Sequence, residues 1–415
     1  MRVPTLAGCA LAAALVASTA ACSSSSSSAA SAAGAAASSS ASPIVIGTVG
    51  SFSGPEGSSQ AGVPQALTAW ADQVNAAGGI HGHPVKLIIK DLGANLAGGQ
   101  QAVRELVQGD HVVAIVGEED NGDASWAQYV QGTGVPVVGG APIDLPFVQN
   151  PDFFASGANS FAMTYGFQVM ARKNGPKLAL LYCAEAPQCA NEILKNQGMA
   201  RASGIKIPVD IKISATAPDY TAVCEQLKSS GVQSYFVADN SAVVLRVASQ
   251  CKADGLTAKM VAEDGVFTVA WENQPQVNGM LAAEADAPFT DSSVPAVAKF
   301  QDAIKKYAPN IGSELGPDAY YAYVAGVLFQ TAVQAIPAGA AITPQAVKQG
   351  LYTLKDNTLG GLAPPLTFTP GKPTLVDCYF TMGLSNGQFT TPVGARYNCA
   401  PAASVSAIVA SLPKE

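Results

Sequence analysis

The chain has 415 residues, of which 48% are hydrophobic and 13% are charged, and its formal net charge at pH 7 is −7. A chain of this length is too large for one compact core, so we expect two domains. The small number of charged residues and their negative balance leave no basic patch for phosphate groups. Nucleic acid is therefore excluded as an expected partner.

Residues 1–21 have the composition of a secretory signal peptide. A single basic residue, Arg2, precedes an apolar run that is too short for a membrane span, and small residues follow. Cys22 comes directly after Thr19-Ala20-Ala21, which resembles the bacterial lipobox, where the chain is cut before the cysteine and the cysteine is then acylated. The alternative is an ordinary signal peptide in which Cys22 has no role.

Residues 22–43 are almost entirely serine and alanine. They have no large apolar side chains to offset the entropy of ordering, so we expect a flexible tether. About twenty such residues reach roughly 25 Å. The sequence thus predicts a lipid on Cys22 as the only membrane contact, holding the folded part at the outer face of the cell membrane.

From residue 43 onward, short Val/Ile-rich strands alternate with amphipathic helices. The first series has strands at 43–54, 83–91, 112–117 and 135–141, with helices at 61–79, 98–109 and 124–134. The second series has helices at 160–175, 188–204, 219–231 and 242–256, with strands at 176–183, 205–213, 232–240 and 258–264. This alternation predicts two parallel, doubly wound α/β domains.

The last part of the chain has a different pattern. Helices are predicted at 294–309, 316–336 and 343–354 without strands between them. Short strands follow at 365–373 and 377–389, and the Ser-Asn-Gly-Gln sequence from Ser385 predicts a hairpin turn. Residues 403–415 are expected to form a C-terminal tail.

Six cysteines remain once Cys9 and Cys22 are set aside. An even number in an exported chain predicts disulfides, although the sequence alone leaves the pairing open. We favour sequential pairs, because each then lies within one local unit: Cys183 with Cys189, Cys224 with Cys251, and Cys378 with Cys399. No C-x-x-C motif is present and the three histidines lie far from these cysteines, so we expect neither a metal nor a cofactor.

Three stretches of the chain resemble the leucine/isoleucine/valine-binding protein family. These are the strand and turn at Gly47–Pro55, the helix end "NAAGGIHG" at Asn75–Gly82, and "VVAIVG" followed by "GVPVVGGA". Members of this family are type I periplasmic binding proteins that feed ABC importers. The resemblance covers residues 44–400 and implies two Rossmann-like doubly wound parallel-sheet domains joined by a three-segment hinge.

The resemblance also implies that each domain is discontinuous. We place the crossovers near Asn159, Ala285 and Gly360. The first lobe would then contain residues 44–159 and 286–360, and the second lobe residues 160–285 and 361–402. On this division the helices between 294 and 354 cover a sheet that is already built.

A ligand is expected beyond the carboxyl ends of the strands, where helix N-termini present free N–H groups. Ser53 and Ser59 lie in the loop after the first strand, and Ser59 occupies a position where the family often has an aromatic contact. Asn121 falls where the family offers a small hydroxyl group to the ligand carboxylate. Gly140 and Ala141 are expected to offer backbone N–H groups, because they permit close approach.

Acidic residues crowd Asn121, which disfavours a carboxylate ligand; they are Glu118, Glu119, Asp120 and Asp123. A solvated acidic loop that caps a helix is the alternative interpretation. In the second domain, Asp239 ends a strand at the opposing rim. Asp264 matches the family position for an acidic partner of a ligand ammonium group, with Glu263 as the alternative if the register slips by one residue.

These features predict a monomeric, extracytoplasmic solute-binding lipoprotein. It would capture a small polar solute, such as an amino acid or a related compound, and deliver it to the permease of an ABC importer. One alternative is a sensor domain that docks on a signalling receptor. An α/β enzyme is a weaker alternative, because Phe52 stands where a G-x-S-x-G nucleophile motif needs serine.

Overall fold

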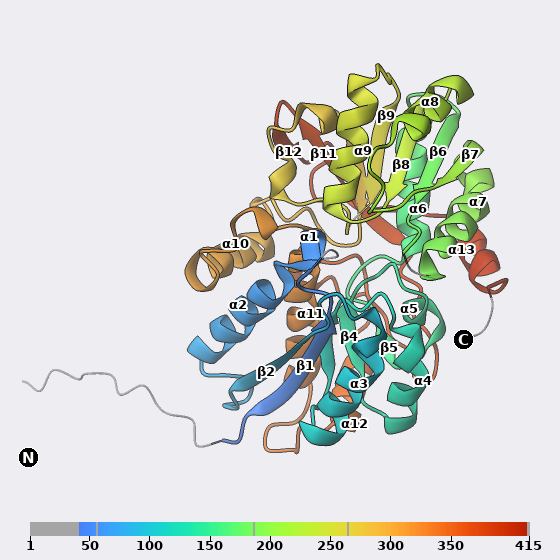
Figure 1. The fold of residues 1–415 in the computed structure, drawn as a ribbon. Helices are drawn as coiled ribbons and strands as arrows, with labels where there is room; N and C mark the ends of the chain where they lie inside the picture. The colour runs from blue at the N-terminus through green and yellow to red at the C-terminus, as the bar shows by residue number, and fades with distance from the viewer. Residues whose placement is uncertain (1–40, 55–56, 186, 264, 413–415) are drawn as a thin grey trace, which may run out of the picture. The chain divides into compact units, whose positions relative to one another are not determined.

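The computed structural model describes residues 41–54, 57–185, 187–263 and 265–412 (Figure 1). The predicted signal peptide, Cys22 and most of the predicted tether lie outside the described residues, and so does Asp264. Within the described ranges, no helix is both long enough and apolar enough to cross a membrane.

The first domain is built on a sheet of five parallel strands in the order β2-β1-β3-β4-β5. The strands are β1 (Ile44–Gly50), β2 (Val85–Asp91), β3 (Ile115–Glu118), β4 (Val137–Gly140) and β5 (Phe153–Phe154). Neighbouring residues of β3 and β4 point to opposite faces of the sheet. Val116 and Val138 join one apolar cluster, and Ile115 and Val137 join another, so both faces of this sheet are covered.

One face of this sheet carries the long helices of the domain, and α11 packs directly against β3, β4 and α2. These helices are α2 (Val63–Ala76), α10 (Pro295–Tyr307), α11 (Pro317–Gln334) and α12 (Pro344–Tyr352). The other face carries α3 (Gly99–Arg104), a π-helical turn at Glu105–Gly109, and α4 (Ala124–Thr133). The helices between 294 and 354 therefore have no sheet of their own because they cover this one.

The second domain is built on a larger sheet in the order β12-β11-β10-β9-β8-β6-β7, and β13 pairs with β11. The strands are β6 (Lys177–Tyr182), β7 (Lys206–Lys212), β8 (Ser234–Ala238), β9 (Lys259–Glu263), β10 (Leu281–Glu284), β11 (Cys378–Ser385), β12 (Gln388–Thr390) and β13 (Asn398–Cys399). The strands from β7 to β10 are parallel, whereas β11 and β12 are antiparallel. The prediction of a parallel sheet therefore holds for the strands from β7 to β10, whereas the edge formed by β11 and β12 is antiparallel.

The edge hairpin forms where the sequence predicts it. Asn386 and Gly387 connect β11 to β12 with φ angles of 53° and 77°. Positive φ at both central residues is the requirement of a type I′ turn, which Asn-Gly satisfies at low cost. Residues 365–373, by contrast, do not form a strand, and only Leu366 makes an isolated bridge, to Asn357.

The helices of the second domain are α6 (Ser160–Arg172), α7 (Asn191–Ser203), α8 (Thr221–Ser230), α9 (Ser241–Ala253) and α13 (Ala402–Val409). The sequence predicts only a tail from residue 403 onward, but most of this stretch belongs to α13, which packs against α7. A Cβ atom on Gly198 would lie 3.0 Å from the Ile408 side chain, which is tighter than an ordinary contact, so the glycine allows the two helices to pack closely.

The three disulfides confirm the sequential pairing. Their Cα–Cα distances are 5.3 Å for Cys183–Cys189, 4.9 Å for Cys224–Cys251 and 3.9 Å for Cys378–Cys399. The first closes a short loop before α7, the second joins α8 to α9, and the third joins β11 to β13. Each therefore stabilises one local unit, as the spacing suggested.

The segments that connect the two domains are hydrogen-bonded to one another. The Ala158 N–H donates to the Ala285 carbonyl at 3.0 Å, and the Asn159 N–H donates to the Val376 carbonyl at 2.9 Å. The Asn159 side chain also donates to that carbonyl at 3.0 Å. Two of the three predicted crossover positions thus lie side by side.

The third connection lies further along the chain than Gly360. Phe368 still packs against Phe154 of β5, with ring centroids 5.3 Å apart, so this part of the chain remains on the first domain. The connection therefore lies nearer to Val376. The error arose because the sequence gives no signal for a loop that runs along the first domain without regular structure.

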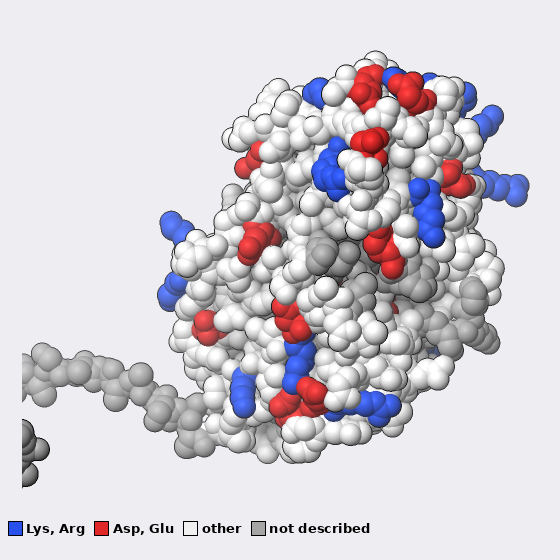
Figure 2. Space-filling view, viewed as in Figure 1, with Lys and Arg blue, Asp and Glu red and all other residues white. Residues whose placement is uncertain are grey.

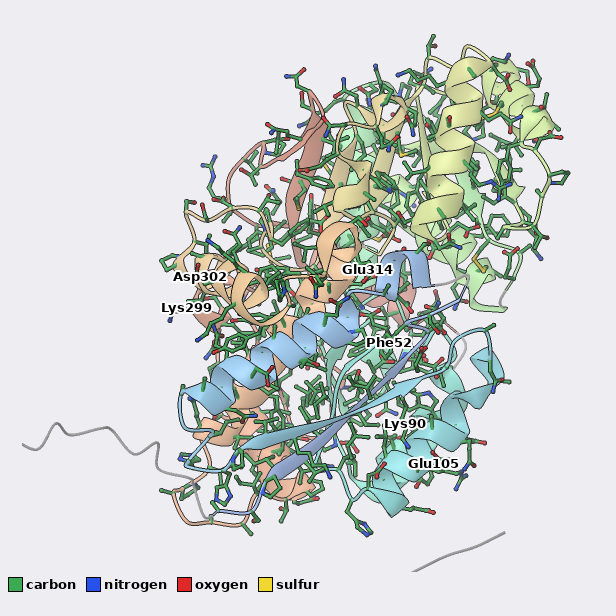
Figure 3. The ribbon with its side chains drawn as sticks, turned by 60° about the vertical axis from the view of Figure 1, so that its left-hand side comes forward. Phe52, Lys90, Glu105, Lys299, Asp302 and Glu314 are labelled. Carbon is green, nitrogen blue, oxygen red and sulfur yellow. A yellow bond between two sulfur atoms is a disulfide. The ribbon has the colours of Figure 1, made fainter. Side chains whose placement is uncertain are left out.

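Charged side chains on the face seen in Figure 2 lie singly or in small groups, separated by uncharged surface. Figure 3 shows one such group at Lys90 of β2 and Glu105. The Lys90 ammonium lies 3.0 Å from the Glu105 carboxylate and 3.5 Å from that of Asp110. Because these side chains are partly exposed, such pairs contribute about 0–1 kcal/mol each.

Gly326 provides a test of the contact between α11 and α2. A Cβ atom at this position would lie 2.3 Å from the Trp70 ring, so Gly326→Ala is expected to lower the free energy of unfolding by about 1–3 kcal/mol. Gly132, on the exposed surface of α4, is the matched control: its Cβ would meet nothing within 4 Å. There the change to Ala should be neutral or stabilising by up to about 1 kcal/mol. Urea unfolding measures both, and equal effects would contradict this packing.

Candidate ligand-binding site

A cavity of about 130 Å³ lies at the carboxyl ends of strands from both sheets. Its wall includes Glu119 after β3, Ala141 after β4, Cys183 after β6, and Asp239 after β8. This is where ligands bind in open α/β sheets. The volume is close to the roughly 150 Å³ of a cavity that holds one benzene molecule, so it suits a small solute.

The structure brings four of the predicted contact residues together on this wall: Ser59, Asn121, Ala141 and Asp239. Asp264 lies outside the described residues, and Glu263 and Gly265 on either side of it line the cavity.

Ser53 is not part of the wall. Its side chain is exposed, and it hydrogen-bonds to Asp91 at the end of β2. Although partial burial opposes ionisation, this bond and those from nearby backbone N–H groups lower the pKa of Asp91 below its ordinary value. Ser53 therefore stabilises the turn after β1 instead of facing the cavity.

Gly140 and Ala141 use their backbone within the protein. Gly140 has φ 143°, and a Cβ atom there would lie 2.3 Å from the Glu118 carbonyl oxygen. The Ala141 N–H donates to that same carbonyl at 2.9 Å. The close approach that these small residues permit is thus between β3 and β4, and the Ala141 N–H is engaged there.

The acidic loop after β3 is buried, so its interpretation as a solvated loop is wrong. The exposed fractions are 0% for Glu118, 2% for Glu119, 0% for Asp120 and 2% for Asp123. Asp120 accepts hydrogen bonds from the Trp126 indole at 2.7 Å and from the Gly122 N–H at 2.9 Å. Burial raises the pKa of Asp120, and the bonds from Trp126 and Gly122 act against that rise.

Among the residues that the structure describes, seven carboxylates and one lysine ammonium line the cavity. The first domain contributes Glu119, Asp144 and Asp318. The second domain contributes Glu185, Glu192, Asp239 and Glu263, and also the cation Lys195.

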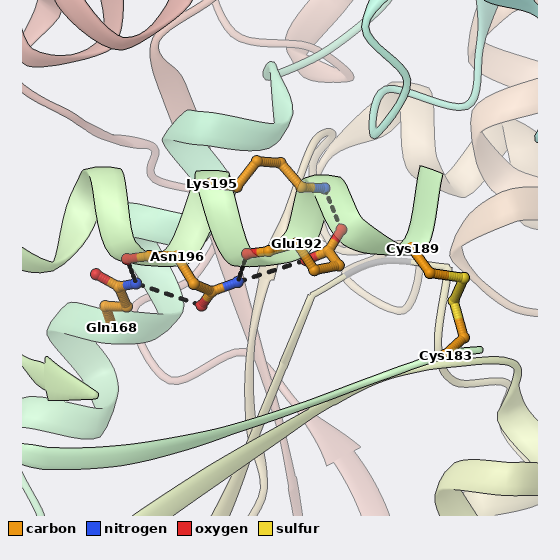
Figure 4. A network of polar contacts seen from close by, with 6 residues as sticks. All are labelled: Gln168, Cys183, Cys189, Glu192, Lys195 and Asn196. Atoms are coloured by element: carbon orange, nitrogen blue, oxygen red, sulfur yellow. Dashed lines mark hydrogen bonds and ion pairs between the residues drawn. A yellow bond between two sulfur atoms is a disulfide. The ribbon is translucent and has the colours of Figure 1, made fainter. Parts of the chain in front are cut away.

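Lys195 lies at one end of a polar network on α7 (Figure 4). Its ammonium forms an ion pair with Glu192 one helical turn earlier. The Asn196 amide donates to the Glu192 carbonyl at 3.0 Å, and Gln168 of α6 donates to the Asn196 carbonyl at 2.9 Å. The Cys183–Cys189 disulfide precedes this helix and lines the same cavity, so α7 is tied to the wall at its N-terminal end.

Opposing effects set the protonation of Lys195. Burial disfavours the ammonium, but the carboxylates of Glu192, Glu263 and Asp144 outweigh it and raise the pKa of Lys195 above its ordinary value. Lys195 is therefore a cation at neutral pH, and its charge is already matched by an acidic partner.

A contact between the domains lies beside the cavity, where α1 (Gly57–Gln60) meets the N-terminus of α9. The Ser241 N–H donates to the Ser59 hydroxyl at 3.0 Å, and the Ala242 N–H lies 3.3 Å from the Ser58 hydroxyl. Ser58 in turn donates to the Asn240 side chain at 3.0 Å. Side chains of the first domain thus cap a helix of the second. Serine is a common capping residue because its hydroxyl oxygen accepts from N–H groups that have no partner within the helix.

Among the wall residues that sequence reasoning missed, three illustrate different signals. Asp144 lies in the loop after β4 that contains Ala141, only three residues further on. Asp318 lies in the first turn of α11 behind Pro317, which is a helix-start signal at a strand rim. For Lys195, the only signal in the sequence is its Glu-x-x-Lys spacing with Glu192. This spacing is common on helix surfaces and does not indicate a cavity.

Comparison with known proteins agrees with this geometry. Residues 43–388 match the periplasmic binding protein family. The structure of a branched chain amino acid ABC transporter from Thermus thermophilus with bound valine is 16% identical, with a TM-score of 0.76, and the match covers 85% of this chain and 96% of that one.

Two further solved structures share the fold. A fatty acid ABC transporter substrate-binding protein from Thermomonospora curvata is 16% identical with a TM-score of 0.70, covering 87% of this chain and 95% of that one. A solute binding protein from R. palustris in complex with benzoate is 14% identical with a TM-score of 0.69, covering 86% and 98%.

The chain therefore belongs to the periplasmic binding protein family, whose members bind solutes outside the cytoplasm and are not enzymes. This confirms the resemblance to the leucine/isoleucine/valine-binding proteins and the two-domain α/β fold.

The buried Glu118 predicts how stability depends on pH. Burial, followed by the charge of Asp144, raises the pKa of Glu118 well above 4.5, so the folded state holds this proton more tightly than the unfolded chain does. The stability that this group contributes is complete below about pH 4.5 and is lost as the pH rises through the raised pKa. We expect Glu118→Gln to raise the free energy of unfolding by about 1–3 kcal/mol at pH 8 and to change it little at pH 4.

The control for this prediction is Glu225→Gln on the exposed surface of α8. Urea unfolding at both pH values measures the two variants. An effect of Glu118→Gln that is the same at pH 4 and pH 8 would show that Glu118 ionises normally in the folded protein.

Proposed function

We propose that this protein is the extracytoplasmic solute-binding component of an ABC importer. It captures a small polar solute, an amino acid or a related compound, between its two domains. The observation that supports this function is the cavity at the opposed strand ends, because residues of both domains line it. A solute there would contact both domains at once.

Capture would work by closure. A solute that contacts both domains favours the arrangement in which they are close, and so shifts an equilibrium between open and closed forms. The hydrogen bonds that the Ser58 and Ser59 hydroxyls make with the N-terminus of α9 would form only in the closed arrangement. They would add to the stabilisation that the solute provides, and the permease would recognise the closed form.

The contact residues that we assign to the solute follow from the wall of the cavity. Ser59, Asn121, Ala141 and Asp239 line it. We also propose Asp264 as the acidic partner of a solute ammonium group, with the buried Glu263 beside it. Valine, fatty acid and benzoate, which appear in the descriptions of the similar structures, differ widely in shape and charge, so the fold does not determine the solute.

The Ser59 hydroxyl should support solute binding through the domain contact. A thermal-shift screen with amino acids, amides and polyols identifies a bound solute, and calorimetry then measures its affinity. We expect Ser59→Ala to weaken that affinity by about 3- to 30-fold, because an N-cap bond contributes about 0.5–2 kcal/mol to the closed form.

The control for Ser59 is Ser53→Ala, since Ser53 is in the loop after the same strand but does not line the cavity. The affinity of Ser53→Ala for the solute should match that of the parent protein. Equal losses in both variants, or none in Ser59→Ala, would contradict the proposed closure contact.

We also propose that Cys22 carries a lipid that anchors the protein to the outer face of the membrane. Cells that express the full chain would be grown with a radioactive fatty acid. The parent protein should be labelled and Cys22→Ser should not, because the acylated thiol is then lost. Absence of label on the parent protein would end the lipoprotein assignment.

A further inference from the structure

We propose that the cavity selects a small aliphatic cation, an amine or a guanidine with a short hydrocarbon body, over zwitterions and carboxylates. This inference rests on the proposed function, because it concerns the charge of the solute that the same cavity takes. The arrangement of charge around the cavity supports it.

Carboxylates outnumber cations on the wall by seven to one among the described residues. They come from both domains, so they surround the cavity instead of lying on one side. Such an excess attracts a cation and repels an anion, and it does so more strongly where the acidic side chains are buried than where they are exposed.

The one lysine on the wall does not reverse this preference. The Lys195 side chain is 2% exposed, and its ammonium pairs with Glu192 on the same helix. A solute carboxylate that reached Lys195 would have to compete with that partner and approach Glu263 and Asp144 as well. Lys195 therefore balances part of the acidic wall and is a poor anchor for an anion.

A second acidic group lies behind the wall, independently of the lining residues. Glu118 is fully buried, and its Oε1 atom has no hydrogen-bond partner among the residues that the structure describes. Its other carboxylate oxygen accepts from the Asp120 N–H at 3.0 Å. Glu118 interacts electrostatically with Asp144, which lines the cavity, so a cation held there would favour the ionised form of Glu118 and lower its raised pKa.

The same wall offers contacts for a hydrocarbon body. Pro142, Ile143 and Val266 line the cavity beside the acidic residues. Apolar walls with a few polar groups are typical of small-molecule sites, where the polar groups fix orientation. Methylene groups between or beside the charged ends of an amine fit such a surface.

The test compares four probes on the full chain by calorimetry and thermal shift. Putrescine is a dication, 1,4-butanediol is its uncharged counterpart of similar size, and L-valine and benzoate represent zwitterions and anions. We expect putrescine to bind at least tenfold more tightly than each of the other three, and to lose affinity as salt is added.

Two variants of opposite charge effect sharpen the test. Asp318→Asn removes one negative charge from the wall and should weaken putrescine binding about tenfold, whereas Lys195→Gln removes the positive charge and should strengthen it severalfold. Neither should alter the weak binding of 1,4-butanediol. Glu225→Gln on the exposed surface of α8 is the control, and unfolding without probe shows whether each variant is folded; Asp239→Asn replaces Asp318→Asn if that variant is not.

The outcomes separate the inference from the proposed function. The cation preference is wrong if L-valine or benzoate binds more tightly than putrescine, or if Asp318→Asn and Lys195→Gln leave the affinity for putrescine unchanged. In either case the solute-binding function stands. If none of the four probes binds, the cation preference is overturned, whereas the proposed function fails only if the screen of amino acids, amides and polyols also finds no bound solute.

Discussion

The burial of carboxylates around one cavity is the constraint on which the rest of the site depends. Moving an ionised carboxylate out of water costs several kcal/mol unless hydrogen bonds or opposite charges offset it. Here the offsets come from neighbouring elements: the Trp126 indole of α4 bonds to Asp120, and Lys195 of α7 pairs with Glu192. The helices that flank the strand ends thus stabilise acidic groups at the cavity or beside it, and the acidic groups on the wall give the cavity its charge.

Two of the sets of hydrogen bonds between the domains differ in kind. Backbone groups of Ala158, Ala285, Asn159 and Val376 bond to one another where the chain passes between the domains. In the second set, the serines of α1 use only their side chains, which bond to the Asn240 side chain and to the Ser241 N–H. Side-chain bonds at a helix end can break without disturbing either sheet, whereas the backbone bonds form part of the connection itself. This difference suits a molecule that opens and closes about fixed segments.

The sequence predicts the long elements well because each has a strong local pattern. The alternation of strands and helices, the Asn-Gly hairpin and the disulfide pairs depend on residues that are near one another in the chain. Elements such as β10 and α5 (Pro146–Gln149) have only four residues each, too few for a period to appear. The mixed edge of the second sheet depends on pairing between distant segments, which no local pattern contains.

The site is less predictable for the same reason. Strand ends and rim loops could be located, and Ser59, Asn121, Ala141 and Asp239 do line one cavity. The role of Gly140 could not be seen, because it depends on how closely β4 approaches Glu118. The burial of Asp120 depends on Trp126, whose contact is set by the start of α4, and Lys195 reaches the wall only because α7 begins at the rim.

The claim that a solute is clamped between two moving domains is tested most directly by a distance measurement in solution. Spin labels at exposed positions on the two domains, Gln131 of α4 and Glu225 of α8, would report their separation by pulsed electron resonance. The account predicts a broad distribution without solute that narrows and shifts to a single population when a bound solute saturates the cavity. A distribution that is the same with and without saturating solute would contradict it.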